Sequence, residues 1–223
     1  GAATLELRDL RLAAPRGAAL ARGLSLRLAP GSHLMVTGPN ASGKSSLGRV
    51  LLGFWGASGG EALVCGRRIS PGSRPGGGEL FAVPQRPYLC HGLSLAEQLA
   101  YPGGGEVSDE ALRDVLGAVG LAYLLVRFDA RSELPPWQDV LSGGEQQRLG
   151  FARCLFHRPR VALLDDCSSM VSQEAEVSLY RALVERGITA LAMSQRLALP
   201  DIFTQELALG QDTDRGWVLR IRF

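Results

Sequence analysis

The chain has 223 residues, of which 46% are hydrophobic and 21% charged, and its formal net charge at pH 7 is +2. A length of this order can bury one sizeable core with a smaller lobe beside it. The near balance of charge and the lack of a basic tract argue against a nucleic-acid partner. No apolar run approaches the ~20 residues that span a bilayer, and no secretion-signal pattern opens the sequence, so we expect the chain as given to be soluble.

The first part of the chain alternates short strands with a glycine-rich turn. Residues 4–8 and 24–28 alternate apolar and polar side chains, which predicts two half-buried strands of an antiparallel sheet. Residues 34–37 form a short apolar strand, 38–43 a turn, and 45–53 a helix with an apolar face. Strand, glycine-rich loop and helix in this order provide the context that a phosphate-binding loop requires.

The middle of the chain predicts two further strands and a helical lobe. Apolar strands are expected at 62–65 and 80–83, with the glycine-rich segment 71–78 as a loop between them. Ser108 is expected to cap an amphipathic helix, because apolar residues follow it at i, i+3, i+4 and i+7. Residues 121–128 continue this lobe.

The last part of the chain returns to alternating helices and strands. Helices are expected at 144–157 and 173–186, and apolar strands at 161–164 and 188–193. Helices that alternate with apolar strands imply a parallel sheet covered on both faces.

A glycine-punctuated motif links the strand at 34–37 to the helix that follows it. The motif reads G-x-x-x-x-G-K-S and is followed by a second serine: Gly38, Pro39, Asn40, Ala41, Ser42, Gly43, Lys44, Ser45 and Ser46. Its glycines let backbone NH groups turn inward around phosphate oxygens, Lys44 can reach the β and γ phosphates, and Ser45 can offer its hydroxyl to Mg²⁺. Lys44 is the single lysine among 24 basic residues, which indicates that this position requires a slender ammonium group. The motif predicts a nucleotide bound with its magnesium ion.

A second element must supply a carboxylate for the metal. The apolar strand at 161–164 leads directly into Asp165 and Asp166, and Asp165 is expected to bind Mg²⁺ directly or through water. Acidic residues also end strands for the simple reason that strand ends reach solvent. The metal interpretation therefore depends on the phosphate loop.

Residues 141–148 form the most specific motif, LSGGEQQR. Ser142, Gly143 and Gly144 at a helix N-terminus form an anion site, and Glu145 follows Ser142 in capping-box spacing. An ordinary capped helix would show the same spacing. The whole string, about one helix before the strand of Asp165, resembles the signature of ABC ATPases.

The resemblance implies an α/β fold, the ABC-type P-loop NTPase cassette. Such a cassette has a mostly parallel core sheet, an N-terminal antiparallel β subdomain and a helical subdomain. The implied core covers 1–84 and 144–223, and the helical subdomain about 85–143. Two cassettes of this family stack head to tail, so that Ser142, Gly143, Gly144 and Glu145 of one chain cover the ATP γ-phosphate held by the other chain.

Gln85 matches the Q-loop glutamine of the family, which contacts the metal and water. The implied metal ligands are Ser45, Gln85 and Asp165. The residues implied to take part in hydrolysis are Asp166, Gln85 and Gln195.

Finer strings resemble subfamily D, the peroxisomal fatty-acyl-CoA transporters, and their bacterial half-transporter relatives. They include 84–88, 137–142 and 157–159, and the resemblance covers nearly the whole chain. It implies a transmembrane domain upstream in the same chain, lipid or fatty-acyl-CoA as substrate, and a place on the cytosolic face of a peroxisomal or bacterial inner membrane. Peptide transport is the alternative. As in that subgroup, the segment 14–17 offers no aromatic residue to stack on adenine.

The chain departs from the family pattern at several positions. Asp166 stands where the family has the glutamate that orients or deprotonates the attacking water, and it is one methylene shorter. Gln195 stands where the family has a histidine, and glutamine cannot take up a proton. Ala41 replaces a usual glycine of the phosphate loop, and Ser172 a common aspartate, although subfamily D shares that serine. The hydrolysis prediction depends on Asp166 and Gln195 alone. We therefore expect MgATP binding with slow or absent hydrolysis at the chain's own site.

Two functions stay open at this point. The chain is either an energy-coupling ATPase domain of a transporter, or a degenerate ATP-binding module that dimerises to regulate a hydrolytic partner. The two differ in whether ADP is released. Soluble ABC ATPases that act on DNA or ribosomes are disfavoured, because no long coiled-coil insertion separates the phosphate loop from the signature.

Overall fold

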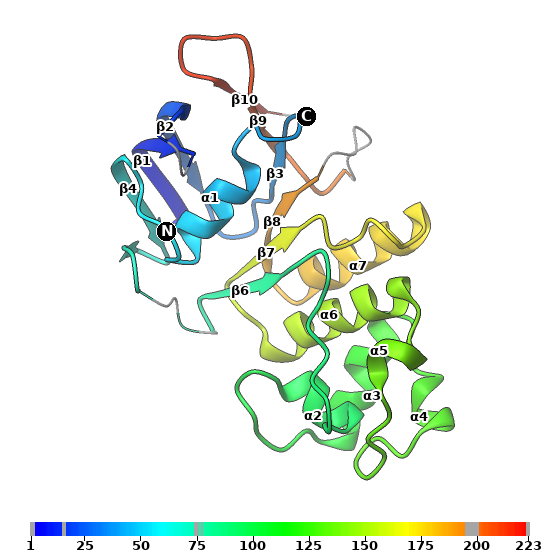
Figure 1. Cartoon of the computed structure of the whole chain (residues 1–223). Helices are drawn as coiled ribbons and strands as arrows, with labels where there is room; N and C mark the ends of the chain where they lie inside the picture. The colour runs from blue at the N-terminus through cyan, green and yellow to red at the C-terminus, as the bar shows by residue number, and fades with distance from the viewer. Residues whose placement is uncertain (1–2, 15–16, 74–75, 77, 195–200, 222–223) are drawn as a thin grey trace.

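The computed structural model describes residues 3–14, 17–73, 76, 78–194 and 201–221, and it contains two sheets (Figure 1). The smaller sheet is antiparallel, with strand order β2-β1-β4-β5. Its strands are β1 (Leu5–Ala13), β2 (Ala19–Leu28), β4 (Gly59–Val64) and β5 (Arg67–Ile69). The predicted strands at 4–8 and 24–28 belong to β1 and β2, which are both longer than expected.

The larger sheet has six strands in the order β10-β9-β3-β8-β7-β6. Every neighbouring pair in it is parallel except β9 with β10. Its strands are β3 (Leu34–Thr37), β6 (Leu80–Val83), β7 (Val161–Asp165), β8 (Thr189–Met193), β9 (Gln205–Leu209) and β10 (Trp217–Ile221). The predicted α/β fold with a mostly parallel core sheet is confirmed.

Seven helices lie in the described part of the chain. They are α1 (Lys44–Leu51), α2 (Leu95–Ala100), α3 (Asp109–Ala118), α4 (Leu124–Arg127), α5 (Trp137–Val140), α6 (Gly143–His157) and α7 (Gln173–Glu185). Figure 1 shows α2 to α5 gathered into one lobe beside α6, at the far end of the molecule from the smaller sheet. Within the described ranges, none of these helices has the length and apolarity to cross a bilayer.

The core sheet is apolar on both faces, as β7 illustrates. Val161 and Leu163 belong to the cluster formed with α1 and the smaller sheet, whereas Ala162 and Leu164 belong to the cluster formed with α6, α7 and the helical lobe. Successive side chains of a strand point to opposite faces, so a strand covered on both sides needs an unbroken apolar run.

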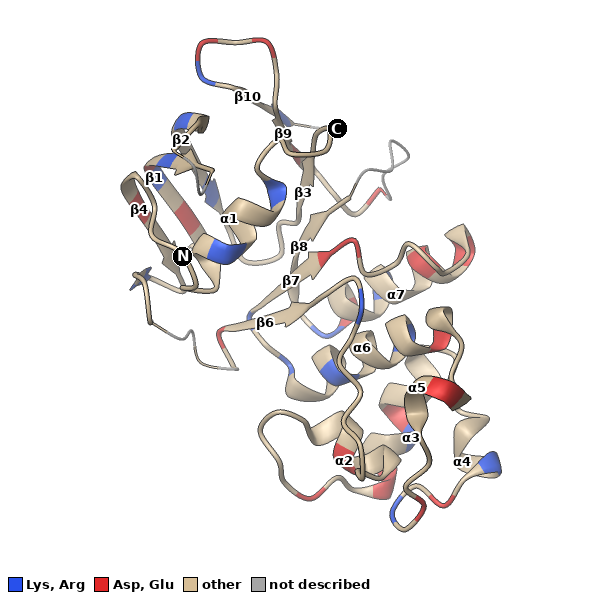
Figure 2. Ribbon diagram, in the orientation of Figure 1, with Lys and Arg blue, Asp and Glu red and all other residues tan. Residues whose placement is uncertain are grey.

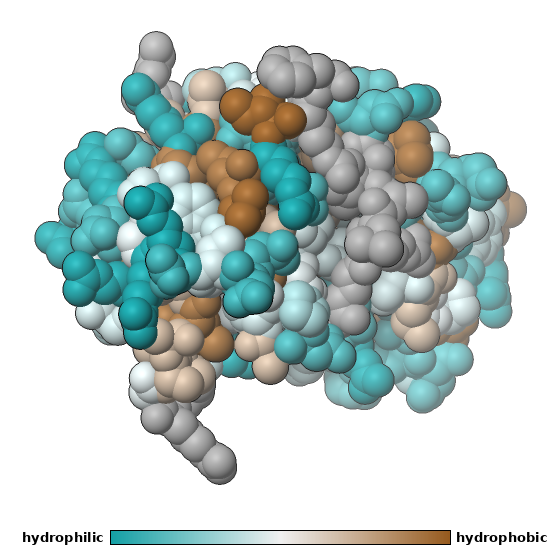
Figure 3. Space-filling view, turned by 90° about the horizontal axis from the view of Figure 1, so that it is seen from above, coloured by the Kyte–Doolittle hydropathy of each residue, from teal (hydrophilic) through white to brown (hydrophobic). Residues whose placement is uncertain are grey.

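The outer surface is mostly polar in the view from above (Figure 3).

Several predicted boundaries were wrong for identifiable reasons. The helix expected at 45–53 ends at Leu51, and Gly53 has φ 70°, a left-handed conformation in which an α-helix cannot continue. A Cβ at this position would also collide with the carbonyl of Ser73. Strand β1 continues past Arg8, and the alternation that would have predicted this breaks at Asp9, which has φ 46° where the pairing with β4 shifts register. The prediction contained no β5, α2, α5, β9 or β10.

Candidate functional site

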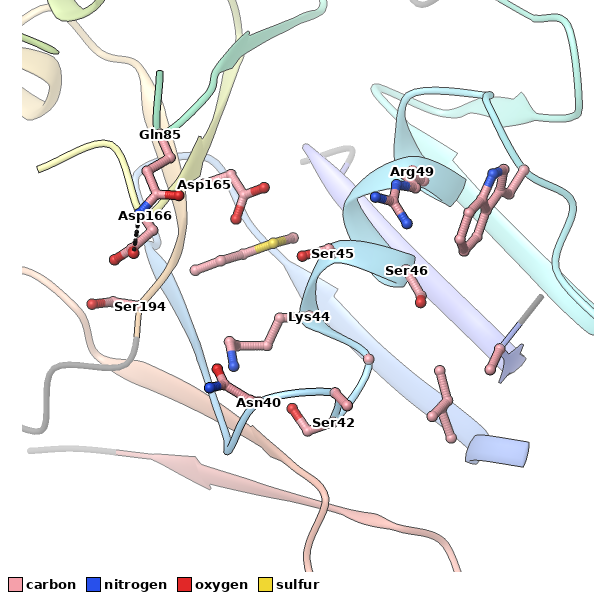
Figure 4. Close-up of a pocket in the computed structure, with 16 residues that line it drawn as sticks. Asn40, Ser42, Lys44, Ser45, Ser46, Arg49, Gln85, Asp165, Asp166 and Ser194 are labelled. Carbon is pink, nitrogen blue, oxygen red and sulfur yellow. Dashed lines mark hydrogen bonds between the residues drawn. The ribbon is translucent and has the colours of Figure 1, made fainter. Parts of the chain in front are cut away.

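A cavity of about 470 Å³ opens at the carboxyl ends of the parallel strands. The phosphate loop follows β3, Asp165 and Asp166 end β7, Gln85 follows β6 and Ser194 follows β8. Ligands of open α/β sheets bind at this edge, since the loops that leave parallel strands converge there. The residues lining the cavity are Ala14, Leu20, Asn40, Ala41, Ser42, Gly43, Lys44, Ser45, Ser46, Arg49, Trp55, Gln85, Asp165, Asp166, Met193 and Ser194 (Figure 4).

The backbone of the phosphate loop requires its two glycines. Gly38 has φ 140°, and a Cβ there would lie 2.5 Å from the carbonyl oxygen of Leu209. Gly43 has φ 108° and is the N-cap residue of α1. Ala41 has φ 62°, a left-handed conformation that costs an L-residue roughly 1–2 kcal/mol. The loop thus keeps its turned conformation at Ala41 at some expense in stability.

The N-terminus of α1 is suited to an anion. Gly43 offers no side-chain cap, and the first turn of α1 has no acidic residue, whereas α2, α3, α6 and α7 are each capped by a serine. The first amides of a helix have no intrahelical acceptor and carry partial positive charge. Gly43, Lys44 and Ser45 at the start of α1 line the cavity, so phosphate oxygens are fitting acceptors for these amides.

Lys44 brings a full positive charge to the same place. Its Nζ donates to the carbonyl oxygens of Gly38 (2.6 Å) and Pro39 (2.9 Å), which holds the ammonium group against the loop. Burial lowers the pKa of Lys44, and the nearby carboxylates of Asp166 and Asp165 oppose that shift. Figure 2 shows the basic residues of α1 and the acidic residues after β7 in the same region of the molecule.

The three predicted metal ligands lie around this cavity. Ser45 supplies a hydroxyl, Gln85 an amide oxygen and Asp165 a carboxylate. Burial raises the pKa of Asp165, while the positive charges of Arg49 and Lys44 oppose the rise. A few oxygen donors beside a phosphate site fit Mg²⁺, which keeps several waters and is held jointly by protein and phosphates. The described residues contain no cluster of three His, Cys, Asp or Glu side chains that would suggest a metal site of another kind.

Asp166 is held by its backbone and by its carboxylate. Its N–H donates to the carbonyl oxygen of Met193 (2.9 Å), and its Oδ2 accepts from Nε2 of Gln85 (3.1 Å). These contacts join the ends of β6, β7 and β8 at the rim of the cavity. The predicted site residue Gln195 lies outside the described residues, and the preceding Ser194 is buried and lines the cavity.

The signature residues form a separate site. Ser142 caps α6, its backbone N–H and Oγ both donate to Oε2 of Glu145 (2.7 and 2.6 Å), and Tyr123 donates to the other oxygen of Glu145. The predicted capping box is therefore confirmed. In the described part of the chain, none of the four predicted signature contacts lines the phosphate-loop cavity. Gly143 and Gly144 lie beside Met170 instead, because a Cβ on either glycine would meet it.

Six cavity residues were missing from the predicted site: Ala14, Leu20, Arg49, Trp55, Met193 and Ser194. Arg49 lies four residues after Ser45 in α1, so helical spacing could have placed it on the same face. Trp55 follows the end of the helix, where no periodic pattern applies.

Strand, phosphate loop and helix at the edge of a parallel sheet define a P-loop nucleotide-binding protein. A family model described as "ABC transporter" matches residues 21–169. The chain belongs to the ABC transporter family.

Curated relatives confirm the resemblance to subfamily D. The chain is 39% identical over 219 residues to "ABC transporter D family member 1" of Arabidopsis thaliana, which covers 96% of this chain and 16% of the relative. It is 39% identical over 194 residues to "ATP-binding cassette sub-family D member 3" of Homo sapiens, covering 84% of this chain and 28% of the relative. The chain thus spans less than a third of the length of these relatives.

A solved structure shares the fold. A bacterial Atm1-family ABC exporter with ATP bound superposes with a TM-score of 0.81 at 23% identity, over 97% of this chain and 38% of the other. At this level of identity the similarity shows the fold alone.

Proposed function

We propose that this chain binds MgATP and uses it to drive a membrane transporter. The proposal depends mainly on one observation: Lys44, Ser45 and Asp165 line the same cavity as the N-terminus of α1, which has no side-chain cap. The ammonium group and the helix amides hold the phosphates of ATP. Mg²⁺, when bound, neutralises phosphate charge, and the oxygens of Ser45, Gln85 and Asp165 are its protein ligands.

The signature of a second copy completes the site. Ser142, Gly143, Gly144 and Glu145 form an anion-binding helix tip that does not line the chain's own cavity. If the helix tip of one copy covers the phosphate loop of the other, two-fold symmetry makes the contact reciprocal, so that each tip covers its partner's loop. ATP would then hold the two copies together, in a homodimer or with a related chain.

Hydrolysis at the chain's own site is slow. Asp166 is one methylene shorter than the family's glutamate, and Gln195 cannot accept the proton that a histidine would take. The Gln85 amide donates to Oδ2 of Asp166, so this amide competes with the attacking water molecule for the carboxylate oxygen. The same residues favour a second candidate function, a regulatory module that binds ATP and leaves hydrolysis to its partner.

The transported substrate is a lipid or fatty-acyl-CoA, and the cassette lies on the cytosolic face of its membrane. The names of the subfamily D relatives support a transporter, and the greater length of these relatives leaves room for a transmembrane domain. An apolar groove of about 550 Å³ beside the segment of Gln85 suits a helix of that domain, with Phe81, Pro87, Tyr88 and Tyr101 among its lining residues.

Isothermal titration of the chain with MgATP tests the proposal. Lys44→Ala should weaken binding at least tenfold, since a hydrogen bond to a charged group contributes roughly 1.5–3 kcal/mol. Arg113→Ala, which removes one exposed positive charge from α3, is the matched control and should bind like the wild type. Unchanged affinity in Lys44→Ala, or no binding by the wild type, would contradict the proposal.

A further inference from the structure

Trp55 and Arg49 occupy part of the cavity that the phosphate residues do not explain. The backbone N–H of Trp55 donates to the carbonyl oxygen of Arg49 (3.2 Å), so the chain turns back over the last turn of α1. The guanidinium carbon of Arg49 lies 4.5 Å from the centroid of the Trp55 ring, which is cation–π distance. Both side chains line the cavity together with Ser46 of the phosphate loop.

The indole N–H of Trp55 donates no hydrogen bond within the described residues. The other two tryptophans donate their indole N–H to backbone carbonyls, Trp137 to Leu93 (2.8 Å) and Trp217 to Arg22 (2.9 Å). Among the described residues, the indole of Trp55 has no such acceptor. Since tryptophan normally finds a hydrogen-bond partner when its ring is covered, a half-buried ring with a spare donor is suited to a ligand.

The lining of the cavity also includes two apolar residues, Ala14 in the connection between β1 and β2 and Leu20 near the start of β2. That connection contains no aromatic residue that could stack on a base. Trp55 is the only aromatic side chain among the described residues that line the cavity.

We propose that Trp55 is the base-recognition residue of this site. Its ring stacks on the purine of a nucleotide whose phosphates lie at the loop, and Arg49 holds the ring in place from its other side. The inference rests on the proposed function, because the same cavity must first hold the phosphates. It assigns the base to the C-terminal end of α1 rather than to the turn between β1 and β2.

Base stacking tolerates different bases, because every base has a π-face. Stacking on Trp55 therefore requires a base but does not distinguish adenine from guanine, so ATP and GTP should bind with similar affinity. Tripolyphosphate carries the phosphates without a base, and it separates the contribution of Trp55 from that of the phosphate loop.

The test is isothermal titration of the full chain with ATP and with tripolyphosphate, each with Mg²⁺. In Trp55→Ala we expect roughly 5- to 150-fold weaker ATP binding, the range for loss of one base–aromatic stack, and unchanged tripolyphosphate binding. Trp55→Phe should keep most of the ATP affinity. Trp217→Ala, which removes an aromatic side chain outside the cavity, should match the wild type for both ligands.

Two results would overturn the inference while leaving the proposed function intact: equal weakening of ATP and tripolyphosphate in Trp55→Ala, or no weakening of ATP. Failure of the wild type to bind either ligand would instead remove the proposed function. If Trp55→Ala does not fold, indole fluorescence decides. ATP, but not tripolyphosphate, should quench the wild type, and the quenching should disappear in Trp55→Phe; quenching that persists there refutes the role of Trp55.

Discussion

At the scale of single residues, Asp166 occupies a conformation that disfavours the glutamate expected from the family pattern. Its φ of 48° lies in the left-handed region, which aspartate and asparagine enter more readily than longer side chains. A glutamate here would extend the carboxylate by one methylene but would strain the backbone. We therefore expect Asp166→Glu to raise the hydrolysis rate and to lower the free energy of unfolding.

The hydrolysis rate should respond to the two substituted positions. We expect Asp166→Glu combined with Gln195→His to raise steady-state ATPase activity by up to about 100-fold, because a displacement of ~1 Å in such a constellation changes rates to this extent. Asp166→Asn serves as the control that removes the charge without extending the side chain. A wild-type rate already equal to that of the double variant would refute the idea of a weakened site.

His33 makes the stability of the fold depend on pH. It is 5% exposed, and its Nδ1 accepts a hydrogen bond from the N–H of Ala190 (3.0 Å), so the neutral ring is the form that fits. Burial lowers the pKa of His33 below its ordinary value of 6.5. Below pH 6.5 the unfolded chain then binds more protons than the folded one, and stability falls as the pH falls.

Urea unfolding between pH 7.5 and 5 measures this contribution, which is at most about 1.4 kcal/mol per pH unit. His33→Gln keeps an acceptor for Ala190 and does not titrate, so its stability should fall less steeply over the same range. Equal pH dependence in both proteins would show that other groups carry the effect.

At the scale of elements, packing constrains the start of α6. A Cβ on Gly143 would lie 2.5 Å from the sulfur of Met170, which is 65% exposed and can move. A Cβ on Gly144 would lie 2.8 Å from the backbone oxygen of Met170, which cannot move without shifting the loop. The second glycine is thus required by the fold itself.

Gly144→Ala should therefore lower the free energy of unfolding by about 1–3 kcal/mol through overpacking. Gly117→Ala in α3 is the matched control, because a Cβ there meets nothing within 4 Å. The control should be neutral or stabilising by up to about 1 kcal/mol, since alanine favours the helix over glycine. Urea unfolding of both variants checks the contrast, and equal effects would remove the packing argument.

At the scale of the whole molecule, the proposed dimer predicts complementation between variants. Ser142→Asp keeps an N-cap residue but adds a negative charge where a partner's phosphate would approach. Lys44→Ala removes the phosphate contact in the other half of the site. Neither variant alone should associate when MgATP is added.

A mixture of the two variants should recover ATP-dependent association, because one of its two sites combines an intact Lys44 with an intact Ser142. Analytical ultracentrifugation with and without MgATP measures this. A mixture that stays monomeric while the wild type dimerises would contradict the head-to-tail arrangement.

Features that depend on near neighbours could be predicted from short stretches of sequence. The strands at 34–37 and 80–83, the serine caps of α3 and α6, and the phosphate loop from Gly38 to Ser46 follow from patterns within a few residues. Capping and hydrophobic periodicity act over about one helical turn, so a short window contains all the information they need.

The grouping of distant segments around one cavity could not be predicted in this way, because it depends on how the whole chain folds. Gln85, Asp165 and Ser194 meet because β6, β7 and β8 are adjacent parallel strands, and no local rule states that order. The same holds for Trp55, which reaches the cavity through a turn after α1. Which side chains surround a ligand depends on strand order and packing, and these are set by the burial of the whole core rather than by any single stretch of sequence.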